Sequence, residues 1–367
     1  MTVMPDWQGR RVLVTGHTGF KGSWLSLWLA EAGAEVTGFA LAPATKPSLF
    51  DAARIESCVT HRVGDVRDMA AVQAVFEQAR PEVVFHLAAQ PLVRLSYQQP
   101  LETYATNVMG TAHVLEAARQ AGGVKAIVCV TSDKCYENRE WAWAYRESDP
   151  LGGHDPYSSS KGCAEIVTAA YRSSYFDKSD PWTGLASVRA GNVIGGGDWA
   201  QDRLIPDIVR AASARATLHI RAPHAVRPWQ HVLEALHGYM LVAERLLAGE
   251  RRSADAWNFG PFDDDAQPVS YIVDHMVAAL GGPGWEIAPG DHPHEAGLLR
   301  LDSAKARAEL GWRPVLGLTE ALNWIALWHR AFARGENARD ITVEQIKVYS
   351  ARSQSSVLGP ALKAAAA

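Results

Sequence analysis

Short apolar segments alternate with longer segments of helical periodicity over the first half of the chain. The apolar runs at 11–15, 35–41, 59–63, 82–88, 126–132 and 183–189 have the length of buried strands. Apolar residues three and four positions apart predict helices at 22–32, 69–79, 105–120 and 156–176. Strands that alternate with helices are typical of a doubly wound parallel sheet with helices on both faces. We therefore predict an α/β fold of the Rossmann type.

The second half of the chain departs from this alternation after Asn192. It continues with Gly195-Gly196-Gly197-Asp198, several helices and short apolar runs. We expect a smaller mixed lobe over the carboxyl ends of the strands, where such sheets bind ligands. The predicted division is a cofactor-binding domain over 1–190 with a return segment near 226–262, a substrate-binding lobe over 191–225 and 263–350, and a C-terminal tail over 351–367.

Composition narrows the class of protein. The 367 residues carry a net charge of −4, so no nucleic-acid partner is expected. The N-terminus lacks a signal pattern and no stretch approaches about 18 uncharged apolar residues, so we expect a cytoplasmic protein without a membrane segment. The four cysteines show no C-x-x-C spacing, and no metal ion is expected.

A glycine-rich turn follows the first predicted strand. Residues 11–22 read R-V-L-V-T-G-H-T-G-F-K-G, which places three glycines between a strand and a helix. Such a turn suits a dinucleotide diphosphate at the helix N-terminus. His17 is unusual there: its ring lies beside the phosphates, or it is an ordinary surface histidine. The expected cofactor contacts in this turn are Gly16, His17, Thr18, Gly19, Phe20, Lys21 and Gly22.

Other positions bear on which dinucleotide binds. Asp65 and Val66 follow the third strand, where the carboxylate accepts from an adenine amino group or simply begins a helix. An NAD site usually has a carboxylate for the ribose about 20 residues beyond the glycines. Residues 37–42 contain no carboxylate and no arginine for a 2′-phosphate, so we favour NAD with one hydrogen bond missing. Further cofactor contacts are expected at the end of the fourth strand, from Leu87, Ala88 and Ala89.

Tyr157 and Lys161 lie four residues apart on the longest of these predicted helices, so their side chains share one face. An ammonium group held there can lower the pKa of a phenol from about 10 toward neutrality, which makes the phenolate a general base. A lone Y-x-x-x-K is common in proteins. Together with a dinucleotide turn, the pair predicts redox chemistry, with both residues also near the cofactor.

Five further segments carry a resemblance to a known family. They read G-H-T-G-F-K-G-S-W, H-L-A-A-Q-P-L-V-R-L-S-Y, T-S-D-K-C-Y, R-A-G-N-V-I-G-G-G-D-W and R-P-W-Q-H-V, in order between 16 and 232. With L-G-W-R-P at 310–314, nearly the whole chain resembles the extended short-chain dehydrogenase/reductases that act on nucleotide sugars, and among them the 4,6-dehydratases. The resemblance implies NAD as cofactor, and CDP-glucose or a related nucleotide sugar as substrate. It also implies a homodimer through the helices at 105–120 and 156–176.

The resemblance also implies a reaction. C4 of the hexose is oxidised, water is eliminated across C5 and C6, and the hydride returns to C6. Tyr157 with Lys161 would act on the C4 hydroxyl, Ser132 would hydrogen-bond the C4 oxygen, and Asp133 would protonate the departing hydroxyl. A carboxyl group does this near neutral pH only where burial raises its pKa. The plain alternative makes Ser132 and Asp133 a turn at the end of a strand.

Lys134 departs from many relatives, which place a glutamate there as the base for C5. An ammonium group cannot abstract a proton, so Lys134 must lose its charge through burial or another residue is the base. Glu137 and Tyr136 are the nearby candidates. A third interpretation gives Lys134 an electrostatic role, steadying the enolate. The sequence leaves all three open.

Substrate contacts are expected from a short set of polar residues. By resemblance, Asn192 would bind the sugar diphosphate and Arg227 would clamp the phosphates or ribose, a task that suits a planar guanidinium. Any of the arginines can instead be structural. The complete predicted set is Ser96, Asn192, Arg203, Arg227 and Arg300.

Two alternatives to the dehydratase remain. One is a related enzyme, such as a 4-epimerase or a dehydratase for another nucleotide. An epimerase needs no carboxylic acid beside the strand-end hydroxyl, so Asp133 argues against it. The other is a cofactor-binding protein that has lost catalysis, against which the complete Ser132, Tyr157 and Lys161 set argues.

Overall fold

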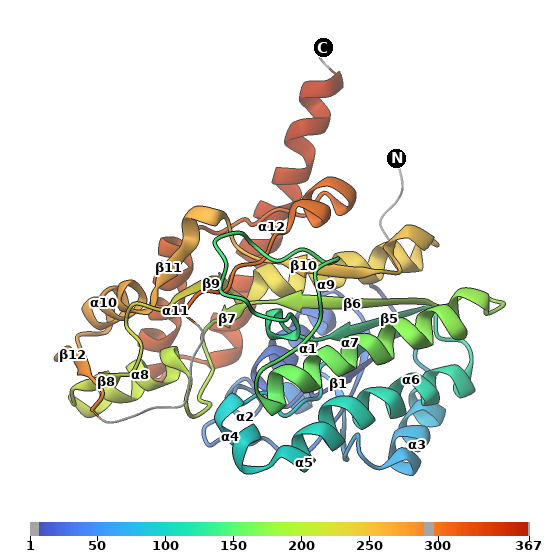
Figure 1. Ribbon diagram of the computed structural model, residues 1–367, viewed down its shortest axis with the longest axis horizontal. Helices are drawn as coiled ribbons and strands as arrows, with labels where there is room; N and C mark the ends of the chain where they lie inside the picture. Colours follow the sequence, from blue (N-terminus) through green and yellow to red (C-terminus); the bar gives the residue numbers. More distant parts are fainter. Residues whose placement is uncertain (1–6, 290–296, 366–367) are drawn as a thin grey trace.

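Seven parallel strands form the central sheet of the computed structural model, which describes residues 7–289 and 297–365 (Figure 1). The strand order is β10-β6-β5-β4-β1-β2-β3, so the chain winds outward in both directions from β1 and β4. This confirms the predicted doubly wound α/β fold. The strands are β1 (Arg11–Thr15), β2 (Glu35–Ala40), β3 (Thr60–Val63), β4 (Val83–His86), β5 (Ala126–Val130), β6 (Gly184–Ala190) and β10 (Ala256–Phe259).

Helices cover both faces of this sheet because alternate side chains of each strand point to opposite faces. Val12 and Val14 pack into one core with α1 (Phe20–Glu31) and α9 (Val232–Leu247). Leu13, between them, packs into a second core on the other face. The helices on that face are α3 (Met69–Ala79), α6 (Gly110–Ala121) and α7 (Pro156–Ser174).

A smaller lobe lies beyond the carboxyl ends of the sheet strands, at the left of Figure 1. It has its own apolar core, in which Trp229 packs with Ile205, Ile272 and Leu322. The lobe contains β7 (Asn192–Ile194), β9 (Val226–His231) and β11 (Ala266–Pro268) in one sheet, β8 (Leu218–Ile220) with β12 (Trp285–Ile287) in another, and the helices α8 (Leu204–Ala214), α10 (Val269–Leu280) and α11 (Leu318–Ala333). The division into domains at the predicted boundaries stays a prediction.

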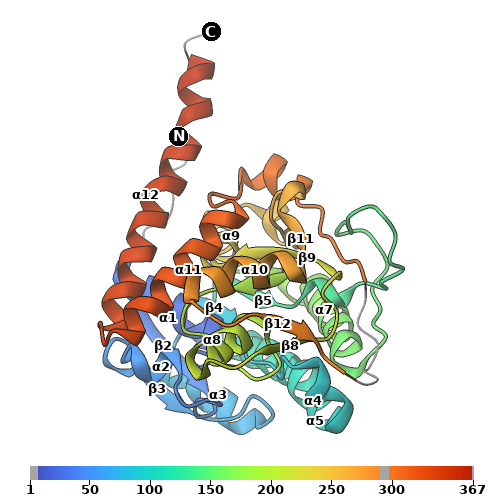
Figure 2. The ribbon, with the colours of Figure 1, turned by 90° about the vertical axis from the view of Figure 1, so that its left-hand side faces the viewer.

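Short helices and one long C-terminal helix complete the described chain. In Figures 1 and 2 the end of α12 (Ala338–Ala365) extends away from the rest of the molecule. In residues 7–289 and 297–365, no helix is both long and apolar enough to cross a membrane. The short elements are α2 (Leu49–Ala52), α4 (Val93–Gln98), α5 (Pro100–Tyr104), π-helical turns at Ala105–Met109 and Ala306–Leu310, and single 3₁₀ turns at Ile55–Ser57, Asp133–Cys135, Phe176–Lys178, Arg251–Ser253 and Asp263–Asp265.

Candidate active site

A cavity of about 710 Å³ lies between the carboxyl ends of the sheet strands and the smaller lobe. This is the edge at which doubly wound sheets bind ligands, and the volume suits a small organic molecule. The sheet and its helices contribute one wall and the lobe the other. Predicted site residues that line the cavity are Phe20, Lys21, Ser132, Asp133, Lys134, Tyr157, Asn192, Arg203 and Arg227.

The glycine-rich turn is closely packed against the end of β4. A Cβ on Gly16 would lie 2.7 Å from the backbone nitrogen of Ala88, and Gly16 also has a φ of +76°, which favours glycine. A Cβ on Gly22 would lie 2.1 Å from the carbonyl oxygen of Gly16. Only glycine permits this approach, and it leaves the backbone N–H groups at the start of α1 exposed to a ligand.

Lys21 adds positive charge to the same helix end. It lies in the first turn of α1, which contains no acidic residue, although a carboxylate there would suit the helix dipole better. Burial, together with the charges of Lys161 and Arg203, lowers the pKa of Lys21 to about 7. A bound anion would relieve this repulsion. The turn therefore fits a dinucleotide diphosphate.

His17 is buried, so the surface alternative is wrong. Its Nε2 lies 2.6 Å from Nδ1 of His61 on β3, and its ring covers Gly38, where a Cβ would lie 2.2 Å from a ring carbon. Burial, reinforced by His61, lowers the pKa of His17 to about 3. The neutral ring thus supports the turn against β2 and β3.

The adenosine end of the predicted cofactor site has no carboxylate at the end of β2. That strand ends at Ala40, and Thr18 Oγ1 donates to the carbonyl of Leu41 at 2.9 Å. Asp65 is bonded to Arg67, Nε to Oδ2 at 2.9 Å, and this contact lowers the pKa of Asp65. The carboxylate that an NAD site usually has for the ribose is therefore absent from residues 37–42, as the sequence predicts.

A hydrogen-bonded chain below the turn was not anticipated from the sequence. His86, the last residue of β4, places Nδ1 2.8 Å from Thr15 Oγ1 and Nε2 3.1 Å from Thr111 Oγ1. Thr15 Oγ1 also accepts from the backbone N–H of Ala88 at 3.2 Å. This chain fixes 87–89 beside the glycine turn. Its partners lie 71 and 25 residues apart, and no local pattern shows such spacing.

Ser132 and Asp133 follow β5 directly. Ser132 Oγ accepts from the backbone N–H of Lys134 at 3.2 Å and donates to Asp133 Oδ1 at 2.9 Å. The two residues therefore do form a turn at the end of the strand, but this turn engages only one oxygen of the Asp133 carboxyl group. Asp133 is 3% exposed, its Oδ2 has no hydrogen-bond partner among the described residues, and burial raises its pKa. This group can remain protonated where an ordinary aspartate would not.

Tyr157 and Lys161 lie on one face of α7, as predicted, and α7 begins where Asp155 Oδ1 accepts from the N–H of Ser158. The pKa of Tyr157 is raised to about 12. Burial is the largest cause, and the Ser132 hydroxyl acts in the opposite direction but is the smaller influence. Lys161 donates to the carbonyl of Val130 at 3.2 Å. Burial lowers the pKa of Lys161 to about 8.

Three candidates for the C5 base can now be compared. Tyr136 is 1% exposed, and its hydroxyl accepts from Arg189 at 2.6 Å and donates to Asn258 at 2.8 Å. Tyr136 also lines the cavity, but burial raises its pKa far above its usual value and its hydroxyl is already bonded on both sides, which disfavours this phenol as the base. Lys134 and Glu137 both line the cavity, and the Glu137 carboxylate is paired with Arg139 at 3.0 Å.

The predicted substrate residues divide into two groups. Asn192, Arg203 and Arg227 line the cavity, whereas Ser96 and Arg300 do not appear among its lining residues. The Ser96 hydroxyl donates to the carbonyl of Val93 in its own helix at 2.6 Å, and Leu299 takes the place beside Arg300 in the cavity wall.

Two cavity-lining cations were missed from the sequence. Arg94 of α4 and Arg221, which follows β8, both face Asp202, with ion pairs of 2.8 and 3.8 Å. Arg94 stands in the quoted segment 86–97, but nothing in the sequence shows that it meets the lobe. Asp202 lines the cavity as well, so these arginines belong to a mixed charged part of its wall.

Comparison with known proteins agrees with this geometry. The model of the GDP-mannose 4,6 dehydratase family matches residues 13–324. A CDP-glucose 4,6-dehydratase of Salmonella typhimurium is 55% identical over 347 residues, covering 94% of this chain and 97% of the relative. The solved dTDP-glucose 4,6-dehydratase DesIV of Streptomyces venezuelae, with NAD bound, is 25% identical with a TM-score of 0.75, covering 87% of this chain and 97% of that one. The UDP-glucose 4-epimerase of Thermus thermophilus, in complex with NAD, has the same identity and TM-score, covering 87% of this chain and 99% of that one.

The fold is that of the extended short-chain dehydrogenase/reductases that modify nucleotide sugars. Within that class the chain belongs to the GDP-mannose 4,6 dehydratase family. The predicted resemblance is thereby confirmed.

Proposed function

We propose that this chain is an NAD-dependent 4,6-dehydratase that converts CDP-glucose to CDP-4-keto-6-deoxyglucose. The family and the 55% identity to a CDP-glucose 4,6-dehydratase support the reaction and the nucleotide. The observation that carries the proposal is Asp133, a buried carboxyl group with one unpartnered oxygen in the wall of a cavity that also contains Ser132 and Tyr157. An epimerase has no use for such an acid.

The glycine-rich turn, Lys21 and the start of α1 would hold the diphosphate of NAD. NAD, when bound there, supplies the acceptor for the C4 hydride and its donor to C6. Thr18 and the segments at 65–66 and 87–89 would border the adenosine and nicotinamide parts. The packing of Gly16 on Ala88 leaves room for a backbone-to-phosphate contact and for no additional side chain.

Tyr157 would take the proton of the C4 hydroxyl while Ser132 hydrogen-bonds the same oxygen. For this the pKa of Tyr157 must fall from about 12. The site provides positive charge for that purpose: Arg203 lowers the pKa of Tyr157, and Lys161 lies one helical turn along α7. The backbone N–H of Lys134, which donates to Ser132 Oγ at 3.2 Å, keeps the hydroxyl at the end of β5 when its proton turns from Asp133 to the substrate.

Asp133 would protonate the C6 hydroxyl as it departs. Its raised pKa supplies the proton near neutrality, and its unpartnered Oδ2 is the atom available to the substrate. Removal of the C5 proton is assigned to Lys134 or Glu137, since the Tyr136 hydroxyl is already bonded to Arg189 and Asn258. If Lys134 keeps its charge, it steadies the enolate that forms when C5 loses its proton.

Asn192 and Arg227 would hold the diphosphate of the sugar nucleotide, and Arg203 the nucleotide. Arg227 lies on β9 and is 8% exposed, so its guanidinium is held against the cavity rather than in solvent. Arg203 is bonded to Asp198 at 2.9 Å, which fixes it at the start of α8. The choice of cytidine rests on the similarity to the dehydratase from Salmonella typhimurium.

We also propose a cytoplasmic homodimer formed through the helices at 105–120 and 156–176. Large apolar side chains are exposed on this side, including Met109 at 51% and Ile166 at 58%. Leu101, on α5 immediately before, is 82% exposed. Replacement of Ile166 by Asp should shift the molecular mass in solution from dimer to monomer.

The reaction is tested by incubating the purified protein and NAD with CDP-glucose, UDP-glucose, dTDP-glucose and GDP-mannose in parallel. The proposal expects alkali-induced ultraviolet absorbance of a 4-keto-6-deoxy sugar, fastest with CDP-glucose. Formation of CDP-galactose without that absorbance would show an epimerase instead. Faster turnover of another nucleotide sugar would keep the assignment as a dehydratase and change only the nucleotide of its substrate.

A further inference from the structure

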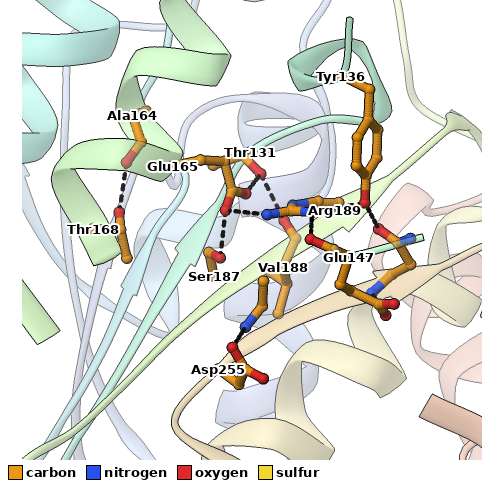
Figure 3. A network of polar contacts seen from close by, with 12 residues as sticks. Thr131, Tyr136, Glu147, Ala164, Glu165, Thr168, Ser187, Val188, Arg189 and Asp255 are labelled. Carbon is orange, nitrogen blue, oxygen red and sulfur yellow. Dashed lines mark hydrogen bonds and ion pairs between the residues drawn. The ribbon is translucent and has the colours of Figure 1, made fainter. Parts of the chain in front are cut away.

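Glu165 lies on the same face of α7 as the two predicted catalytic residues. It follows Lys161 by four positions and Tyr157 by eight, a spacing that aligns all three side chains along the helix. Glu165 is 3% exposed and lies below the cavity rather than in its wall. Figure 3 shows its carboxylate at the centre of a buried network of polar contacts.

The carboxylate of Glu165 has partners on both oxygens. Oε1 accepts from Thr131 Oγ1, and Oε2 accepts from Ser187 Oγ at 2.7 Å and from Arg189 Nη2 at 2.8 Å. Burial opposes ionisation of this group, but Arg189 and the hydroxyls outweigh it and the pKa of Glu165 is lowered. The result is a buried, ionised carboxylate.

Arg189 carries the network to the turn that follows β5. Its Nη1 donates to the Tyr136 hydroxyl at 2.6 Å and to the carbonyl of Glu147 at 3.2 Å, and its guanidinium lies 4.9 Å from the centre of the Tyr136 ring. Tyr136 in turn donates to Asn258 on β10 at 2.8 Å. Thr131, at the other end, directly precedes Ser132. The network therefore holds 131–136 from both sides.

The groups around the Lys161 ammonium differ in charge. The charge of Lys161 interacts with Glu165 on α7, Cys129 on β5 and Cys135 in the turn after β5, and also with Lys21 on α1 and His86 on β4. Burial raises the pKa of both thiols and lowers that of His86 to about 3, so these three are neutral. Of the five groups, Glu165 alone is an anion at neutral pH.

We propose that Glu165 is a positioning residue for the reaction, which keeps Lys161 an ammonium and, through Thr131 and Arg189, ties α7 to the strand end that carries Ser132 and Asp133. The proposal rests on the function given above, in which Tyr157 and Lys161 act on C4. A neutral Lys161 would donate a weaker hydrogen bond and supply no field to Tyr157. The ionised Glu165 prevents this although Lys161 is buried.

The test is Glu165→Gln, which keeps the size of the side chain, removes its charge and replaces one acceptor oxygen by an amide donor. Loss of the anion leaves the Arg189 cation unbalanced, so the pKa of Lys161 should fall further below about 8. Lys161 would then be neutral at a lower pH. In the pH profile of kcat, we expect the alkaline limb to shift to lower pH by about one unit, with KM for the nucleotide sugar little changed.

Ser187→Ala is the matched control, because it removes one neutral hydrogen bond from the same carboxylate and no charge. Its alkaline limb should stay at the wild-type position. Glu165→Asp keeps the charge with a shorter reach, and its limb should lie between those of wild type and Glu165→Gln. A purely structural role would lower activity in all three variants without this order of pH limbs.

A second readout does not depend on turnover. In the full-length protein with ¹³Cε-labelled lysine, the Lys161 signal, assigned with Lys161→Arg, should titrate at lower pH in Glu165→Gln than in wild type. An unmoved titration in folded Glu165→Gln, or in Glu165→Asp if the glutamine variant does not fold, would overturn the proposal. If the titration of Lys161 shifts but the protein does not dehydrate nucleotide sugars, the effect of Glu165 on Lys161 stands and the proposed function fails.

Discussion

Ser132 donates a hydrogen bond to Oδ1 of Asp133 at 2.9 Å, whereas Oδ2 of the same carboxyl group is buried without a hydrogen-bond partner among the described residues. One oxygen is thus used to hold the turn, and the other remains for the substrate. Leaving a buried polar atom unpaired costs about 1–3 kcal/mol. Such an atom calls for an explanation, and for an oxygen in the wall of the cavity a contact with the substrate supplies one.

Asp133→Asn should separate C4 oxidation from loss of the C6 hydroxyl. The amide keeps the shape of the side chain but cannot give up a proton, so elimination should slow by about 10²–10⁴-fold while C4 oxidation survives. In a single turnover followed by absorbance at 340 nm, NADH and a 4-keto hexose should accumulate. Wild-type rates of elimination in this variant would show that another group is the acid.

The stability of the protein should also depend on pH through Asp133. Its pKa is raised in the folded state, so folding binds an extra proton: this contribution is complete below the unfolded value of about 3.9 and is lost as pH rises through the folded value. Asp133→Asn has no carboxyl group to titrate there, so its stability does not fall with pH in this way. Urea denaturation should show the variant gaining on wild type as pH rises from the unfolded pKa through the raised folded pKa of Asp133. A difference that does not change with pH would contradict the raised pKa.

Lys134→Met should decide between the two remaining candidates for the C5 base. If Lys134 is the base, exchange of the C5 proton with deuterated solvent stops, while C4 oxidation continues. If it only steadies the enolate, exchange slows without stopping and Glu137→Gln shows the deeper loss. Tyr136→Phe is the control that should keep C5 exchange, because its hydroxyl is bound to Arg189 and Asn258. Undiminished exchange in Lys134→Met would exclude lysine.

The absence of a carboxylate after β2 predicts loosely held NAD. A hydrogen bond to a charged group is typically worth about 1.5–3 kcal/mol, so its loss weakens binding about tenfold or more. Purified protein should be partly without cofactor, and added NAD should raise its activity. Ala40→Asp, at the last residue of β2, should bind NAD about tenfold more tightly, with Ala40→Asn as the uncharged control. Full NAD occupancy of the wild type after long dialysis would contradict this account.

Much of the sheet was predictable because its strands are apolar runs bounded by turn residues. The predicted bounds of β1 and α3 match the structure, at Arg11–Thr15 and Met69–Ala79. The helix predicted over 105–120 is preceded by α5 and passes through a π-helical turn at Ala105–Met109, which no periodicity of 3.6 reveals. The three-residue strands β7 and β11 are too short to show a period.

The candidate site was predictable where it depends on strand ends and helix spacing. Ser132 and Asp133 follow a buried strand, and Tyr157 starts a helix, so topology alone brings them to one edge. The directions of the side chains could not be predicted in the same way. The ring of His17 is set by His61, 44 residues away, and Ser96 bonds within its own helix. A resemblance transfers a position along the chain, not the direction in which its side chain points.

The path of one hydrogen atom tests the central claim most directly. CDP-glucose deuterated at C4 is incubated with the enzyme and unlabelled NAD, and the product is analysed by NMR, with Tyr157→Phe as the variant that should not oxidise C4. The proposed reaction predicts deuterium at C6 of a 4-keto-6-deoxy sugar, without net accumulation of NADH. Stoichiometric release of deuterated NADH with a stable 4-keto sugar that keeps its C6 hydroxyl would contradict it.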